Sequence, residues 1–575
     1  MKLINLCFFF ILVAVAGCHS TVTPPAKQTT ICNPVNISYR FQPDRPSRRE
    51  AADPTVLQFK GDYYLFASKS GGYWYSDNLV NWTFVPTNDL PVEDYAPTAV
   101  AIGDTVYFLA SSSHGNIYKT TDPKSGKWQI ACKSFAISLT DPALFLDNDQ
   151  RLYLYWGCSD KTPIYGIQID YKHNFVPMGK PVKLIYGHPE KFGWEVPGDY
   201  NTDTLHSPWI EGAWMNKHNG KYYLQYAGPG TQFKSYSDGV YIGDNPLGPF
   251  TPAVDNPFSY KPEGFADGAG HGSTFTDKYG NYWHIATSTI SVKHMFERRL
   301  VLYPAFFDDG GNLHADTGFG DYPMIMPQKK IKDEAEIFPG WMLLSYKKKV
   351  TVSSSVDSFP SQNMVDENIR TFWAAKTGKN NEWAELDLGK QYNVFAVQID
   401  FAELDAHLFG RADSLFYRYK VEISTNGRRW KTIIDKSHNQ TDCSQDYTQL
   451  PQKIAGRYVR INSISVPGGH FALSGFRVFG KGNGNLPAAV SRVTALRNPN
   501  DKRKVQLTWS KSPTATGYLI RFGVSKDKLY QSYQVYQDTS LSVNSLNRDQ
   551  NYYFTIKPFN ENGVHPGTII TEGKL

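Results

Sequence analysis

The sequence is short of cysteine, of excess charge and of long apolar runs, and each shortage excludes a class of protein. Six cysteines among 575 residues are too few and too scattered for a disulfide framework or a zinc-binding pattern. A net charge of +6 is small for this length, so we expect no nucleic-acid partner. Beyond the N-terminus the sequence has no apolar run of about 18 residues, the length that could span a membrane.

Amphipathic helical patterns are also scarce, whereas turn-forming and aromatic residues are plentiful. The chain contains 46 glycines and 35 prolines, and 14% of its residues are aromatic. Aromatic runs bounded by turn residues are typical of strands, so the composition predicts an all-β protein. The length predicts about three domains.

The first residues are typical of a secretory signal. A positive charge precedes the apolar stretch Leu6–Ala16, and Val15–Cys18 has the small residues of a processing site. The last four residues resemble a bacterial lipobox, which implies residues 1–17 as a signal peptide, a lipid on Cys18 and residues 18–32 as a tether. An ordinary secretory signal is the alternative. Both predict export, and the lipid would place the protein on the periplasmic or cell-surface face of a bacterial membrane.

The cysteines that follow the signal leave room for one structural disulfide. Cys132 and Cys158 are the preferred pair among them. The pairing stays open, because spacing alone does not determine connectivity.

Five segments in the first half of the chain share one layout. Each has a polar or proline-containing pair, a strand-like run, a turn and a second run rich in aromatic residues, which is typical of a β-hairpin. Two steps of 44 residues lead from Asp53 to Asp141, and longer steps lead to Glu211 and His271. A period of about 40–50 residues with several strands per repeat indicates propeller blades. The sequence therefore predicts a five-bladed β-propeller over residues 33–335.

The start of these repeats gathers ionisable side chains. In a propeller the first strand of every blade lines the central axis, so residues at the same place in successive repeats converge. Asp53, Asp141, Glu211 and His271 should then meet at one end of the axis. A single acid at such a place is more simply a turn former, but four ionisable residues at one place in the repeat favour a functional site.

Short motifs around these residues carry a family resemblance. The motifs are Ala52-Asp53-Pro54, Thr140-Asp141-Pro142, Ile210-Glu211-Gly212 and Gly270-His271-Gly272-Ser273, in this order, together with the strand-like stretch Ser76–Trp82. The set resembles glycoside hydrolase family 43. The resemblance implies Glu211 as the general acid and Asp53 as the general base that activates water. It implies Asp141 as a third carboxylate, which raises the pKa of the acid and orients it.

The resemblance also implies inversion at the anomeric carbon. In an inverting site the carboxyl groups of the acid and the base, here Glu211 and Asp53, lie about 6.5–9.5 Å apart, with room for a water molecule. Two neighbouring carboxyl groups disfavour each other's ionisation, and burial adds to this effect, so one of them can stay protonated near neutral pH.

Further side chains are candidates for contact with a substrate or a metal. His271 resembles a family histidine that helps to hold a central cation or water, so a structural Ca²⁺ is one interpretation and a hydrogen-bonded core histidine is the other. Either Arg298 or Arg299 could reach back to the acids or to a sugar hydroxyl. Trp209, on the same face as the predicted acid if the segment is extended, and Trp74 could stack on a sugar ring. A place in the core is the alternative for both.

The sequence pattern changes near residue 340. Asn363–Asn368, Trp383–Gly389 and Gly475–Gly480 resemble parts of a discoidin (coagulation-factor type C) jelly roll, which would cover residues 340–481. Such modules often bind sugars through loops at one end. Asp366 lies in a loop that holds a structural calcium in relatives, and an Asx cluster without metal is the alternative.

The last part of the chain, residues 487–575, resembles a fibronectin type III sandwich. Trp509 matches the buried tryptophan of an early strand, and Leu546 followed by Tyr552–Ile556 resembles the tyrosine corner. We expect no chemistry in this domain.

These observations predict a secreted, lipid-anchored, exo-acting inverting glycoside hydrolase. It would remove α-L-arabinofuranosyl or β-D-xylosyl units from plant polysaccharide, act as a monomer and need no cofactor for its chemistry. A β-galactosidase-type activity on the same fold is an alternative. Alternatives from other classes are a non-catalytic glycan-binding surface lipoprotein and a structural adhesin.

Overall fold

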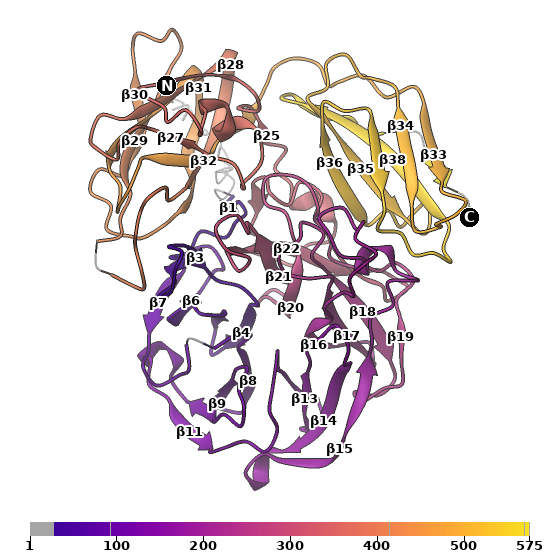
Figure 1. The fold of residues 1–575 in the computed structure, drawn as a ribbon. Helices are drawn as coiled ribbons and strands as arrows, with labels where there is room; N and C mark the ends of the chain where they lie inside the picture. Colours follow the sequence, from indigo (N-terminus) through magenta and orange to yellow (C-terminus); the bar gives the residue numbers. More distant parts are fainter. Residues whose placement is uncertain (1–27, 93, 413, 568–569, 574–575) are drawn as a thin grey trace, which may run out of the picture.

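The computed structural model describes residues 28–92, 94–412, 414–567 and 570–573. Within these ranges the chain forms five consecutive four-stranded antiparallel sheets, then an eight-stranded sheet and then two smaller sheets (Figure 1). The prediction of an all-β fold with a five-bladed β-propeller and a following jelly-roll sandwich is confirmed. The predicted signal peptide and the predicted lipid-bearing Cys18 lie outside the described residues.

The five sheets are the blades of the propeller, and strands that are neighbours in the sequence pair within each blade. The first two blades are β4 (Thr55–Phe59), β5 (Asp62–Phe66), β6 (Gly72–Ser76) and β7 (Thr83–Pro86), then β8 (Thr98–Ile102), β9 (Thr105–Leu109), β10 (Ile117–Thr120) and β11 (Gln129–Cys132). The third blade is β12 (Ala143–Leu146), β13 (Leu152–Trp156), β14 (Ile164–Asp170) and β15 (Val176–Ile185). The last two are β16 (Glu211–His218), β17 (Lys221–Gly228), β18 (Ser237–Gly243) and β19 (Phe250–Pro252), then β20 (Gly270–Thr276), β21 (Tyr282–Thr289), β22 (Arg298–Phe307) and β23 (Leu313–Ala315).

The first strands of the blades close a ring. Strands β4, β8, β12, β16 and β20 each contact the next, and β20 contacts β4 again. Hydrogen bonds cross the boundaries between blades. The Thr55 hydroxyl donates to the carbonyl oxygen of Pro97 at 2.9 Å, and the Leu144 N–H donates to the Thr98 hydroxyl at 3.0 Å. Ring closure brings the residues at the start of these strands to one end of the axis.

Two short ladders complete the propeller. Strand β1 (Thr30–Ile31) pairs with β24 (Met324–Ile325), so the beginning of the described chain is tied to the segment that follows the fifth blade. Strand β2 (Arg40–Phe41) pairs with β3 (Arg49–Glu50), directly ahead of the first blade.

The Asn-Gly signal of the fourth blade forms the turn that its chemistry requires. His218 pairs with Lys221 across a two-residue turn, and the φ angles of Asn219 and Gly220 are +47° and +80°. Two-residue hairpins of this kind need positive φ at both turn residues, which Asn and Gly tolerate best. The hairpin predicted for this repeat is confirmed.

The eight-stranded sheet forms the jelly-roll module. Its two long strands, β28 and β31, change register along their length, and its core includes fully buried Trp373, Val397 and Phe476. The strands are β25 (Met342–Leu343), β26 (Lys349–Val352), β27 (Trp373–Ala374), β28 (Trp383–Phe401), β29 (Arg418–Ser424), β30 (Lys431–Asp435), β31 (Gln445–Ser465) and β32 (Ala472–Lys481).

The C-terminal module, called here the C-terminal sandwich, has one sheet of β33, β34 and β37 and another of β36, β35, β38, β39 and β40. Trp509 is buried, and the Asn547 N–H donates to the Tyr552 hydroxyl at 3.0 Å. The fibronectin type III assignment stays a prediction. The strands are β33 (Val493–Arg497), β34 (Val505–Trp509), β35 (Gly517–Gly523), β36 (Gln531–Tyr536), β37 (Ser540–Val543), β38 (Tyr552–Asn560), β39 (Gly563–Val564) and β40 (Ile570–Gly573).

Helical structure in the described residues is limited to short 3-10 segments, and no helix there is long and apolar enough to cross a membrane. The segments are η1 (Pro123–Ser125), η2 (Tyr171–His173), η3 (Gly193–Glu195), η4 (Glu334–Glu336) and η5 (Ser361–Val365).

Both C-terminal modules pack against the propeller beside the fifth blade (Figure 1). One hydrophobic cluster contains Tyr322 from the propeller side, Phe479 from the jelly roll and Phe559 from the C-terminal sandwich. The ring centroids of Tyr322 and Phe479 are 5.6 Å apart. Burial of aromatic surface from all three parts joins them into one body.

The predicted disulfide between Cys132 and Cys158 is wrong. The four cysteines of the described chain are free. Cys132 lies in β11, the outermost strand of the second blade, where its thiol donates to the Asn174 carbonyl oxygen at 3.5 Å. Cys158 follows β13 of the third blade, and its Sγ lies 3.0 Å from Glu211. Adjacent blades hold the two thiols in different surroundings.

Candidate active site

Each of the five inner strands has a residue in the left-handed region at its start, either two residues before the strand or at the second residue of the strand. The φ angles are +52° at Asp53, +45° at Ala96, +52° at Asp141, +65° at Gly212 and +46° at His271. Such angles are uncommon for residues other than glycine, and five in phase indicate a turn that the fold requires. The sequence prediction placed Glu211 at this position, but the equivalent residue is Gly212, so Glu211 stands one place earlier in its repeat.

Glycine at position 212 has a second reason. A Cβ atom there would lie 2.8 Å from ring carbons of His271, closer than carbon atoms pack. The absent side chain leaves room for the imidazole beside Glu211. The earlier position of Glu211 and the glycine at position 212 together let the carboxyl group and the imidazole lie side by side.

The four predicted ionisable residues do meet at one end of the axis, and all are buried. Asp53, Asp141, Glu211 and His271 are 6%, 7%, 9% and 9% exposed. The imidazole Nδ1 of His271 lies 3.2 Å from Asp53 Oδ1 and 3.8 Å from Asp141 Oδ2. The residues that we predicted to converge thus form one cluster, called here the axial cluster.

Asp53 is surrounded by cationic and hydroxyl donors. Arg298 Nη1 donates to Asp53 Oδ1 at 3.1 Å, and the Ser68 hydroxyl donates to Oδ2 at 2.5 Å. Burial alone would raise the pKa of Asp53, but the charges of Arg298 and His271 outweigh it and hold the pKa below its ordinary value. Asp53 is therefore a carboxylate at neutral pH.

Glu211 has neutral donors on both carboxyl oxygens. The phenol of Tyr236 donates to Oε1, and the Cys158 thiol donates to Oε2 at 3.0 Å. Burial and the charge of Glu211 raise the pKa values of both the phenol and the thiol. Tyr236 and Cys158 therefore keep their protons and remain donors at neutral pH.

Asp141 is the carboxyl group of the cluster whose pKa is raised. Burial raises its pKa to about 7, the charge of His271 opposes this change, and the charges of Glu211 and Asp53 add to it. Carboxylate oxygens of Asp141 and Glu211 and the Cys158 thiol lie within 4.8 Å of one another, so the charge of Glu211 acts on Asp141 at short range. Burial lowers the pKa of His271, but the surrounding carboxylates outweigh burial and raise the pKa above its ordinary value, which favours the cationic imidazole.

The structure distinguishes between the two candidate arginines. Arg298 donates to Asp53 and, through Nη2, to Glu50 Oε1 at 2.8 Å. Arg299 is buried on the other side of β22, where its Nε donates to Gln445 of the jelly roll at 3.2 Å. Arg298 is thus the arginine of the axial cluster.

The two candidate tryptophans differ in exposure. Trp209 is 47% exposed and lies two residues before Glu211, so it remains a candidate for contact with a sugar. The prediction for Trp74 is wrong. Trp74 is 1% exposed in the hydrophobic core, and it lies in β6, which β5 separates from the innermost strand. A side chain that far out along the blade cannot reach the axis.

The predicted metal ligands have hydrogen-bond or ionic partners in the protein itself. Nδ1 of His271 lies 3.2 Å from Asp53 Oδ1 and 3.8 Å from Asp141 Oδ2. Asp366 accepts hydrogen bonds from the Thr371 hydroxyl at 2.7 Å and the Asn368 N–H at 3.0 Å, which matches the alternative of an Asx cluster. Among the described residues, one set of side chains has the spacing of a metal site, and its thiol is a ligand that calcium does not prefer. That set is Asp141, Cys158 and Glu211.

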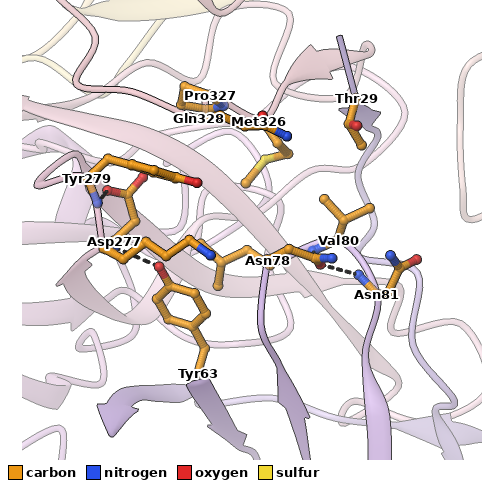
Figure 2. A pocket seen from close by; sticks show the side chains of 12 residues that line it. Thr29, Tyr63, Asn78, Val80, Asn81, Asp277, Tyr279, Met326, Pro327 and Gln328 are labelled. Atoms are coloured by element: carbon orange, nitrogen blue, oxygen red, sulfur yellow. Dashed lines mark hydrogen bonds between the residues drawn. The ribbon is translucent and has the colours of Figure 1, made fainter. Parts of the chain in front are cut away.

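A separate cavity of about 180 Å³ lies at the opposite end of the first and fifth blades (Figure 2). The Lys278 N–H donates to the Tyr63 hydroxyl at 2.7 Å, and the Asn81 N–H donates to Asn78 Oδ1 at 2.9 Å. These groups serve the turns that form the wall. The cavity therefore has no part in the axial cluster.

Sequence reasoning missed four residues that support the axial cluster. Ser68 and Tyr236 lie outside every recognised motif, and Cys158 was considered only as half of a disulfide. Asp238 accepts hydrogen bonds from the backbone N–H groups of His271 and Gly272 at 2.8 and 2.9 Å. Of these four residues, only Cys158 could have been found from the sequence, because it lies just after the aromatic strand of the third blade.

Comparison with known families agrees with this geometry. Residues 46–312 match the family described as glycosyl hydrolases family 43, and residues 349–474 match the F5/8 type C domain. The first match includes every residue of the axial cluster. The chain therefore carries a family 43 glycosyl hydrolase domain followed by an F5/8 type C domain, and both predicted resemblances are confirmed.

Individual relatives are distant. The chain is 29% identical over 164 residues to a beta-xylosidase from Xylanibacter ruminicola, which covers 25% of this chain and 46% of that protein. It is 27% identical over 300 residues to an arabinoxylan arabinofuranohydrolase from Paenibacillus polymyxa, which covers 41% of this chain and 44% of that protein. The chain thus spans about half the length of these curated relatives. A solved thermostable family-43 glycoside hydrolase is 21% identical with a TM-score of 0.41, over 52% of this chain and 98% of that one.

Proposed function

We propose that the protein hydrolyses glycosidic bonds with inversion, with Glu211 as general acid and Asp53 as general base. The observation that supports this most directly is the contrast between the two residues. Asp53 is held as a carboxylate by Arg298 and His271, whereas Glu211 accepts hydrogen bonds from the neutral Tyr236 and Cys158 and lies near Asp141, whose pKa burial raises to about 7. Pairs of carboxyl groups with opposed surroundings are typical of acid–base sites.

The proposed chemistry is a single displacement. Asp53 removes a proton from a water molecule as the oxygen of that water bonds to the anomeric carbon. The bond from this carbon to the leaving oxygen breaks, and Glu211 gives its proton to that oxygen. The reaction leaves Asp53 protonated and Glu211 ionised, and proton exchange with solvent restores both. No cofactor is required for these steps.

We propose α-L-arabinofuranosyl or β-D-xylosyl units of plant polysaccharide as the groups that are removed, in an exo manner. The similarity to two curated relatives, a beta-xylosidase and an arabinoxylan arabinofuranohydrolase, supports these sugars. A third relative, 23% identical over 268 residues, is a beta-D-galactofuranosidase from Aspergillus niger. Galactosides are therefore the alternative substrates.

The proposal includes export and anchoring through a lipid on Cys18. Its support is the sequence alone: an apolar stretch followed by small residues and a cysteine. Replacing Cys18 with alanine should release the protein from the membrane fraction without loss of hydrolysis. Retention of the variant in the membrane would contradict the lipid anchor.

A panel of nitrophenyl glycosides tests the proposed function. We expect release of nitrophenol from the α-L-arabinofuranoside or the β-D-xyloside, and an initial product of inverted configuration by ¹H NMR. The matched control is a variant in which Asn replaces Asp53. Binding of oligosaccharides without hydrolysis of any glycoside would favour a glycan-binding protein instead.

A further inference from the structure

Two neighbouring strands each place one side chain on the axial cluster and the next on the jelly roll. Strand β3 lies beside the start of β22, because Arg299 Nη1 donates to the carbonyl oxygen of Arg49 at 2.9 Å. Successive residues of a strand point to opposite sides. The pair Arg49 and Glu50 and the pair Arg298 and Arg299 both follow this rule.

On one side, Glu50 and Arg298 hold Asp53. Arg298 donates to Glu50 at 2.8 Å and to Asp53 at 3.1 Å, and a third hydrogen bond reaches the Thr231 hydroxyl at 3.2 Å. The side chains of Glu50 and Arg298 are 0% and 3% exposed. Because both side chains are buried, they cannot turn into solvent, and their positions therefore depend on the backbone of β3 and β22.

On the other side, carboxylates of the jelly roll hold Arg49. Arg49 Nε donates to Glu403 at 2.7 Å, and Nη1 donates to Asp442 at 2.8 Å. The side chains of Arg49, Glu403 and Asp442 are 0%, 4% and 13% exposed. Charge-assisted hydrogen bonds between buried side chains have a fixed geometry. Because Arg49 belongs to β3, its bonds to the jelly roll fix the position of this strand.

Further contacts strengthen the same junction. Arg299 Nε donates to Gln445 of the jelly roll at 3.2 Å. The Tyr417 hydroxyl donates to the carboxylate of Glu403 at 2.9 Å, and Lys293 of the propeller donates to the Glu403 carbonyl oxygen at 2.6 Å. Both strands that carry the neighbours of Asp53 are thus anchored in the jelly roll.

We propose that the jelly roll is part of the framework of the active site, in which Glu403 and Asp442 act as positioning residues for Arg298. They act on Arg298 through Arg49 and the backbone of β3. The inference rests on the proposed role of Asp53 as general base. It gives the F5/8 type C domain a task in catalysis that does not require it to bind a sugar.

The test uses the full-length protein with Glu403→Gln and Asp442→Asn, and it measures kcat/KM against pH. Asp53 faces Arg298, His271 and Ser68, together with the carboxyl groups of Glu50 and Asp141. Of these groups, Arg298 and Glu50 depend on β3 and β22. If Arg298 moves away, burial raises the pKa of Asp53, so the base is lost at a higher pH and the acidic limb of the profile moves up.

We expect the acidic limb to move upward by about 0.5 pH unit or more and kcat to fall more than KM changes. Arg521→Gln is the matched control, because Arg521 of the C-terminal sandwich forms a 2.7 Å ion pair with Asp316 of the propeller. This control should lower the Tm without moving the limb. Asp442→Asn keeps the hydrogen bond from Arg49 to Glu403. This variant therefore tests the inference if the Glu403→Gln protein does not fold.

Two results would overturn the inference. One is a wild-type acidic limb in folded Glu403→Gln and Asp442→Asn, and the other is an equal shift in Arg521→Gln. The proposed function is tested separately by Asp53→Asn. If Asp53→Asn is inactive while the jelly-roll variants keep the wild-type profile, the inference alone fails. If Asp53→Asn retains activity, the proposed function fails.

Discussion

The axial cluster has two sides, and they differ in the charge of their hydrogen-bond donors. Asp53 is bonded to the guanidinium of Arg298 and faces the imidazole of His271. Glu211, one residue out of phase in its repeat, is bonded to a phenol and a thiol. Cationic donors favour the ionised carboxylate, whereas neutral donors and nearby carboxyl groups allow a proton to remain.

The difference teaches that the role of a residue in a repeated fold is set by the side chains that contact it, and not by its position in the repeat. Asp53 and Asp141 have the same φ angle of +52° and the same place in their blades. The pKa of Asp53 is lowered, and that of Asp141 is raised to about 7. Arg298 bonds to Asp53 from β22, and this contact separates two otherwise equivalent acids.

The largest effect that can break this comparison is loss of the base. Asp53→Asn should lower kcat by about 10²–10⁴-fold on substrates with good and poor leaving groups alike, because both need an activated water. Azide, which needs no base, should restore turnover in Asp53→Ala and give a glycosyl azide of inverted configuration. Rescue with retained configuration would contradict the assignment.

Loss of the acid should depend on the leaving group. Glu211→Gln removes the proton donor, so hydrolysis of natural oligosaccharides should fall by about 10²–10⁴-fold. A nitrophenyl glycoside needs little protonation and should lose much less. Steady-state rates on both substrate types measure the difference. Equal losses for Glu211→Gln, with leaving-group dependence for Asp53→Asn, would mean that the two roles are exchanged.

A smaller effect should sharpen the comparison through pH. Asp141→Asn removes the carboxyl whose pKa burial raises to about 7. Without this carboxyl group the cluster loses its proton at a lower pH, so the alkaline limb of kcat/KM moves down. A profile that moves upward, or does not move, would show that Asp141 does not sustain the protonated state.

Much of this fold could be predicted because its signals are local. Hairpin turns such as Asn219-Gly220 depend on the φ preferences of two residues. The acids Asp53 and Asp141 each precede a proline, and they are separated by two repeats of equal length. The family motifs then assigned their roles. Local chemistry was enough to predict the blades, the axis and the residues that meet there.

The remainder depends on contacts that sequence spacing does not encode. Tyr236 reaches Glu211 across 25 residues and Cys158 reaches it across 53, through loops whose paths have no periodic pattern. Trp74 was misplaced because an aromatic residue in a strand looks the same at the axis and in the outer core. The offset of Glu211 has no signal in the spacing, because the residue that takes the left-handed conformation in this repeat is Gly212.

The smallest predicted effect concerns the thiol beside the acid. Burial and the charges of Glu211 and Asp141 raise the pKa of Cys158, so the group is a neutral donor rather than a nucleophile. Cys158→Ser keeps a donor next to Glu211 Oε2 and should retain nearly full activity. Cys158→Ala leaves that oxygen without its partner and should lower kcat about fivefold, the value of a typical single hydrogen bond.

The matched control for the thiol is Cys132→Ala, which removes a buried thiol from the outer strand of the second blade, where no axial residue contacts it. This variant should lower the Tm and leave kcat unchanged. Since a donor on the acid matters more when the leaving group needs protonation, the loss in Cys158→Ala should be larger on oligosaccharides than on nitrophenyl glycosides. Equal losses in Cys158→Ser and Cys158→Ala would mean that the thiol fills space and does not orient Glu211.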